Sequence, residues 1–112
     1  MIEYIRKTIP TKELLAQLAE EAAELGHAAL KVRRTLDNTN PTPVTSEEAF
    51  ESLHEEIADI KLVLKALGLD TPNTRSRHTC IMQGKVRRWC DRLGHSSFDP
   101  DSMMGEYEEE NE

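Results

Sequence analysis

The chain has 112 residues, of which 38% are hydrophobic and only 4% are aromatic. That length allows one domain, or one domain with a tail, and a core of Leu, Ile, Val and Ala favours helices over a sandwich or barrel. The net charge of −7 lies entirely from Asp99 onward, where seven acidic residues stand, so residues 1–98 are electrically balanced. This balance disfavours a nucleic-acid-binding surface, and the absence of a run of about 18 apolar residues disfavours a membrane span.

The first eleven residues lack the apolar core of a signal peptide, so the expected location is cytoplasmic. Cys80 and Cys90 would lie about 15 Å apart along one helix, too far to form a disulfide, and are expected to be free thiols. Residues 1–95 are expected to form one helical domain, and residues 96–112 an acidic, disordered tail.

The first part of the chain predicts one long helix. Residues 1–10 form either a short strand-like segment or a short helix that ends at Pro10. A helix is then expected over residues 11–36, with Thr11 as its N-cap. Its expected apolar stripe has sustained spacings of three and four residues. The stripe consists of Leu14, Leu18, Ala22, Leu25, Ala29, Val32 and Leu36.

Two further helices follow the loop DNTNPTPVTS. Thr45 and Glu48 form a Thr-x-x-Glu capping box that begins a helix over residues 46–67. Gly68 is expected to end this helix in a Schellman motif, with Leu69 after it. The last helix is expected over residues 75–93 and is stopped by Gly94.

The second of these three helices is apolar on nearly all sides in its second half, EEIADIKLVLKALG. Such a helix must be covered on most of its surface, which two other helices in so short a chain cannot easily do. The sequence therefore predicts an all-α helical bundle whose core is completed by oligomerisation, as a homodimer or a homotetramer.

Two acidic pairs stand beside apolar positions of these helices. Glu21 and Glu24 are three residues apart on the first long helix, and Glu56 and Asp59 repeat that spacing on the second. Antiparallel packing would bring the four carboxylates together, with Asp59 shielded among apolar neighbours. Four like charges in a half-buried site are relieved by a hard divalent cation, Mg²⁺ or Mn²⁺. The alternative is an ordinary solvated acidic face.

The series Glu20-Glu21-x-x-Glu24 and Glu56-x-x-Asp59 resembles the EExxE…ExxD signature of the MazG-like, all-α nucleoside triphosphate pyrophosphohydrolases. These are related to the dimeric dUTPases and to phosphoribosyl-ATP pyrophosphohydrolase. The resemblance covers about residues 14–93. It departs from the family at the long loop DNTNPTPVTS and at KVRRWCDRLG, where Trp89 replaces an Asn found in many relatives.

The resemblance implies that residues 1–95 are a MazG-like domain. Glu21, Glu24, Glu56 and Asp59 would then hold Mg²⁺, and water would attack the α-phosphorus of a nucleoside triphosphate and release pyrophosphate. Glu20 would orient this water or accept its proton. The base and the sugar of the substrate are left open.

Basic residues supply candidates for binding the outer phosphates. Lys85, Arg88 and Arg92 share one face of the last helix, and Lys31 lies on the same side of its helix as Glu24. The alternative is a solvated basic face. Trp89 is more typical of a core or interface residue than of a base-stacking platform.

Other functions are less consistent with the residues. His78, Cys80, Cys90 and His95 match no standard zinc-finger spacing. The main alternative to an enzyme is a non-catalytic helical interaction module whose acidic surface serves solubility or partner docking.

Overall fold

The computed structural model describes residues 1–37 and 43–94, and within these ranges the chain is helical without any strand, which confirms the all-α prediction. The predicted tail lies outside the described residues. Among the described helices, none has the combined length and apolarity that a membrane span requires. The chain divides into two compact units, Met1–Asp70 and Thr71–Glu112. The helices are α1 (Ile2–Thr8), α2 (Thr11–Asp37), α3 (Ser46–Ala66) and α4 (Pro72–Arg92).

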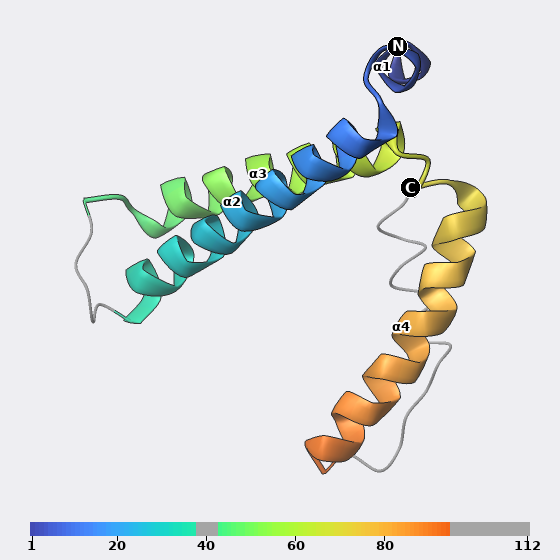
Figure 1. The fold of residues 1–112 in the computed structure, drawn as a ribbon. Coiled ribbons are helices and arrows are strands. Elements are labelled where there is room, and N and C mark those ends of the chain that lie inside the picture. Colours follow the sequence, from blue (N-terminus) through green and yellow to red (C-terminus); the bar gives the residue numbers. More distant parts are fainter. Residues whose placement is uncertain (38–42, 95–112) are drawn as a thin grey trace. The chain divides into compact units, whose positions relative to one another are not determined.

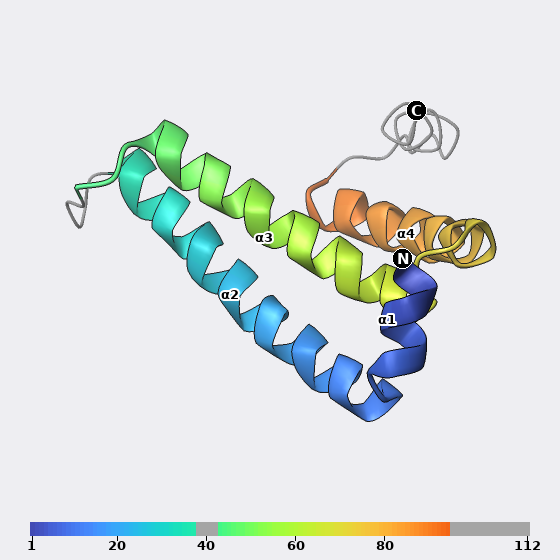
Figure 2. The same cartoon turned by 90° about the horizontal axis from the view of Figure 1, so that it is seen from above.

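The first unit is built on α2 and α3, which run antiparallel and side by side and diverge toward the end where α1 lies (Figures 1 and 2). On each helix, a set of buried or half-buried positions recurs at alternating intervals of three and four residues, the 3.5-residue repeat of coiled-coil packing. We call these positions the seam. On α2 the seam is Leu14, Leu18, Glu21, Leu25, Ala28, Val32 and Thr35. On α3 and its C-cap residue Leu67 it is Ser46, Ala49, Leu53, Glu56, Ile60, Val63 and Leu67.

The α2 seam differs from the predicted apolar stripe by a shift in register. Ala22 and Ala29 are exposed, and Leu36 is 62% exposed, so these three predictions are wrong. Glu21 and Ala28 take inward positions instead. The reason is that the 3.5-residue repeat of inward positions includes a glutamate. A stripe defined by apolar residues alone leaves this glutamate out, and its register then shifts. The predicted members that do lie inward are Leu14, Leu18, Leu25 and Val32.

The ends of α3 lie where predicted, and of the capping box predicted at its start the described residues show the Thr45 half. The Thr45 side chain accepts a hydrogen bond from the backbone N–H of Glu48 at 3.1 Å, as an N-cap should. Gly68 has a φ of 74°, and the N–H of Leu69 donates to the carbonyl of Leu64 at 2.9 Å. This is the Schellman arrangement, whose left-handed residue favours glycine.

Two helix starts differ from prediction. Thr11 is already inside α2, because the Leu14 N–H donates to the carbonyl of Pro10 at 3.1 Å, so Thr11 is not the N-cap. Helix α4 begins at Pro72, three residues before the expected start. Its capping box joins Thr71 and Thr74, with hydrogen bonds of 3.2 Å and 2.7 Å. This Thr-x-x-Thr box lacks the Glu or Gln that makes a capping box conspicuous in a sequence.

Helix α1 resolves the two possibilities for the N-terminal segment in favour of a helix. Its Arg6 side chain donates from Nε to the carbonyl of Ala66 at 3.0 Å and from Nη2 to the carbonyl of Lys65 at 2.8 Å. Carbonyls in the last turn of a helix have no partner within it and carry partial negative charge. The guanidinium therefore fastens α1 to the C-terminal end of α3.

Replacing Arg6 with Ala should lower the free energy of unfolding by about 1–2 kcal/mol, because two charge-assisted hydrogen bonds are lost. Urea denaturation followed by circular dichroism measures this loss. Lys7→Ala, on the same helix, is the matched control and should change stability by less than about 0.5 kcal/mol. Equal stability of both variants would contradict the role of Arg6.

Candidate metal centre

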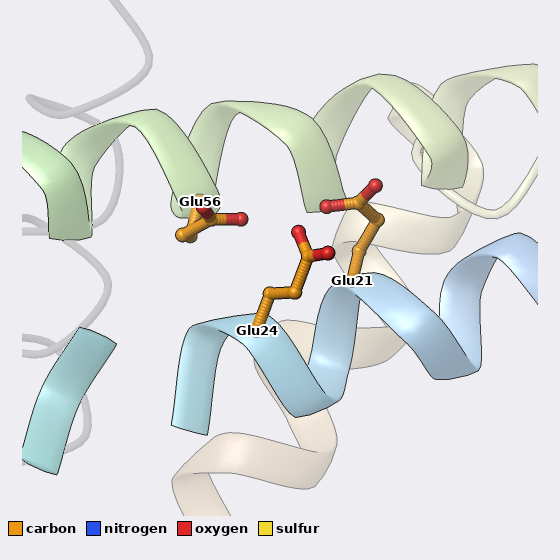
Figure 3. Close-up of side chains that lie close together, drawn as sticks. All are labelled: Glu21, Glu24 and Glu56. Atoms are coloured by element: carbon orange, nitrogen blue, oxygen red, sulfur yellow. The ribbon is translucent and has the colours of Figure 1, made fainter. Parts of the chain in front are cut away.

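Three glutamates converge between α2 and α3. Glu21 and Glu24 come from α2 and Glu56 comes from α3, and all three side chains point toward the space between the helices (Figure 3). One carboxylate oxygen from each lies within 4.8 Å of those of the other two. Across residues 1–37 and 43–94, no other three His, Cys, Asp or Glu side chains come together in this way.

The seam explains why these glutamates meet. Glu21 and Glu56 occupy inward positions where the repeat places apolar residues elsewhere, and both are half-buried. Glu24 is exposed and lies three residues after Glu21, on the neighbouring surface of the same helix. Helix pairing thus forces two acids together, and the third stands at the edge of the seam.

The carboxylates of the seam have unmet hydrogen-bonding capacity. Oε2 of Glu21 and Oε2 of Glu56 are both shielded from solvent, and neither has a hydrogen-bond partner among the described residues. The other oxygen of Glu21 accepts a hydrogen bond of 2.8 Å from Nε2 of Gln17. Gln17 was not among the predicted site residues, although its position four residues before Glu21 was a usable signal. Two shielded oxygens without donors are costly unless a proton or a cation satisfies them.

The electrostatics of the cluster are most evident at Glu56. Desolvation raises the pKa of Glu56 above its ordinary value, and the charges of Glu24, Asp59 and Glu21 raise this pKa further. A hydrogen bond between Glu56 and Glu24 acts in the same direction. The site therefore disfavours its own full ionisation, as expected for like charges held close together.

Asp59 lies outside the group of three. It is exposed, so the expectation that it is shielded is wrong for the single chain. The reason is that α2 covers only one side of α3, and the neighbouring Leu62 is itself 48% exposed. Asp59 and Glu21 nevertheless line a common groove of about 380 Å³.

Other predicted residues of the first unit divide into two groups. Glu20 is exposed on α2 and is not among the three convergent carboxylates. Lys31 does lie near the cluster, because it lines a hollow of about 520 Å³ together with Glu24 and Glu56. His27 lines the same hollow.

The remaining candidates belong to the second unit. Lys85, Arg88 and Arg92 are exposed along α4 at spacings that place them on one face, and their predicted contact with phosphate stays a prediction. Trp89 is 61% exposed, so it is not a core residue of this unit.

The cysteines behave as free thiols, as predicted. No metal-binding group among the described residues includes Cys80, Cys90 or His78, and His95 lies outside those residues.

Comparison with protein families, with curated proteins and with solved structures finds no match to this chain. The chemistry of the cluster must therefore be inferred from its own atoms. An all-oxygen donor set with two unsatisfied, shielded oxygens fits a hard divalent cation such as Mg²⁺ or Mn²⁺, and the lack of His or Cys donors disfavours Zn²⁺.

Replacing Glu56 with Gln should change how stability depends on pH. Because the pKa of Glu56 is higher in the folded protein than in the unfolded chain, protonation of Glu56 stabilises the fold. This stabilisation is complete below the unfolded-state pKa of 4.5 and is lost as the pH rises through the raised pKa of the folded state. At pH 7 in EDTA, Glu56→Gln should therefore have a higher melting temperature than the unmodified protein. This difference should shrink toward pH 4 in a series of calorimetric scans.

The matched control is Glu55→Gln, which removes the same charge from an exposed neighbouring position. The melting temperature of this control should equal that of the unmodified protein across the pH range. A Glu56→Gln variant that melts at or below the temperature of the unmodified protein at pH 7 would contradict the proposed repulsion.

Proposed function

We propose that this protein is a Mg²⁺-dependent nucleoside triphosphate pyrophosphohydrolase of the MazG-like, all-α class. It would convert a ribo- or deoxyribonucleoside triphosphate into the monophosphate and pyrophosphate. The observation that carries this proposal is the pair of shielded, unpartnered oxygens on Glu21 and Glu56, which lie beside Glu24 on facing helices. The spacing of these acids in the sequence also resembles the signature of that class.

Glu21, Glu24 and Glu56 would hold the metal ion. Asp59 would complete the set, since it follows Glu56 by one turn and its charge already raises the pKa of Glu56. When bound, Mg²⁺ would neutralise the triphosphate and lower the pKa of a water molecule. Gln17 would keep Glu21 in place through its hydrogen bond.

The other residues of the site would handle the proton and the phosphate charge. Glu20 is four residues before Glu24 and exposed, so its carboxylate is available to orient the attacking water or to accept its proton. Lys31 would neutralise charge on the outer phosphates from the hollow that it shares with Glu24.

We also propose that the protein is a homodimer or homotetramer. Several large apolar side chains of α2 and α3 are between 43% and 62% exposed. This is more exposed apolar surface than a monomeric pair of helices requires. A second copy would cover them and would shield Asp59. These side chains are Leu15, Leu30, Leu36, Phe50 and Leu62.

The purified protein should release pyrophosphate and a nucleoside monophosphate from at least one member of a panel of ribo- and deoxyribonucleoside triphosphates. The reaction should require Mg²⁺ and stop in EDTA. Glu21→Gln should reduce turnover by at least about a hundredfold, because it removes a ligand charge, while Glu55→Gln should retain it. Pyrophosphate detection coupled to chromatography of the nucleotides measures both products.

Failure of every nucleotide to react in the presence of Mg²⁺ would contradict this activity. If Mg²⁺ also left the melting temperature unchanged, the acidic cluster would instead belong to a non-catalytic interaction module.

Light scattering coupled to size-exclusion chromatography should give a mass of two or four times 12.7 kDa at micromolar concentration. The exposed apolar surface of α2 and α3 is the reason for this expectation. A mass of one chain under these conditions would rule out the stable oligomer.

A further inference from the structure

The carboxylate cluster stands between two hollows of opposite chemistry. On one side, the groove of about 380 Å³ is lined mainly by apolar side chains, together with Glu13, Gln17, Glu21 and Asp59. On the other side, the hollow of about 520 Å³ includes Glu24 and Glu56. Along α2, the groove uses residues 13–21 and the hollow uses residues 24–34, so the cluster marks the boundary between them.

The larger hollow contains the basic side chains. His27, Lys31 and Arg34 follow Glu24 at spacings of three, four and three residues and therefore lie along one side of α2. Helical side chains lean toward the N-terminus of their helix, so Lys31 and Arg34 lean toward Glu24. Among the described residues, Lys31 makes no ion pair. Ser52 from α3 adds a hydroxyl to the lining.

The smaller groove has the opposite character. Its floor includes the buried side chains of Leu14, Val63 and Ala66, and α1 and its C-cap residue contribute Ile5 and Ile9. No Lys, Arg or His lines this groove, and its charged members are all carboxylates. Such a surface repels phosphate and favours the flat, less polar part of a ligand.

We infer that the two hollows fix the direction in which the substrate lies along the helix pair. The nucleoside occupies the apolar groove, the α-phosphate lies at the carboxylates, and the β- and γ-phosphates occupy the hollow with His27, Lys31 and Arg34. This inference rests on the proposed function and assigns His27, Arg34 and Ser52 to substrate binding.

This direction of substrate binding is consistent with the chemistry of pyrophosphate release. The water oxygen bonds to the α-phosphorus, and the bond from that phosphorus to the bridging oxygen breaks. The bridging oxygen keeps the electron pair and leaves with pyrophosphate, while the proton of the water passes to a carboxylate or to solvent. Negative charge therefore grows on the leaving group, and Lys31 and Arg34 lie where they would stabilise it.

Product inhibition tests the two ends of the substrate separately, because pyrophosphate comes from one end and the nucleoside monophosphate from the other. With the full chain, Mg²⁺ and the nucleotide it hydrolyses best, Lys31→Gln and Arg34→Gln should each raise the inhibition constant of pyrophosphate by about tenfold or more. Both should leave the inhibition constant of the nucleoside monophosphate within about twofold. Ile5→Ser and Ile9→Ser should do the reverse, because both side chains line the apolar groove and neither lines the hollow.

Matched controls are Arg33→Gln and Ala29→Ser, whose exposed side chains line neither hollow and whose replacement should leave both constants unchanged. If the enzyme turns over and each variant shifts both constants equally, or shifts neither, the direction is wrong while the activity stands. If the unmodified protein neither turns over nor binds pyrophosphate with Mg²⁺ by calorimetry, the inference falls together with the activity.

Discussion

The structure depends on one constraint: the seam that joins α2 to α3 contains a glutamate on each helix. Continuous packing of the apolar seam positions on both sides keeps Glu21 and Glu56 inward, although their charges repel. Burial of the apolar seam side chains between the paired helices thus supplies the free energy that keeps the two glutamates close together. Each glutamate leaves one shielded oxygen without a donor, and a proton or a divalent cation can satisfy it.

The same helix pair gives the site its asymmetry. Within α2, apolar and acidic side chains precede the cluster and basic side chains follow it. The apolar groove therefore lies before the cluster along this helix, and the basic hollow lies after it. Arg6 contributes indirectly, because it fastens α1, which forms one wall of the apolar groove. The fold therefore links a structural contact at the end of α3 to the shape of the proposed nucleoside subsite.

Local sequence signals predicted the helices well and their packing less well. The cap at Thr45 and the Schellman end at Gly68 depend on a few neighbouring residues, and both were correct. The seam of α2 was misplaced because its repeat includes Glu21, which only the partner helix identifies as an inward position. The exposure of Asp59 depends on what covers α3, and the local pattern around it did not reveal this. The spacing of the acids predicted three of the convergent side chains, whereas the basic hollow needed the tertiary structure.

Binding of a divalent cation by the seam carboxylates can be measured by titrating the metal-free protein with Mn²⁺ and recording the electron paramagnetic resonance signal of the free ion. We expect saturable loss of this signal, reversed by excess Mg²⁺, and at least about tenfold weaker binding in Glu21→Gln than in Glu55→Gln. If the free-ion signal instead grows in proportion to added Mn²⁺ from the first addition, or if both variants bind equally, these carboxylates do not form a cation site.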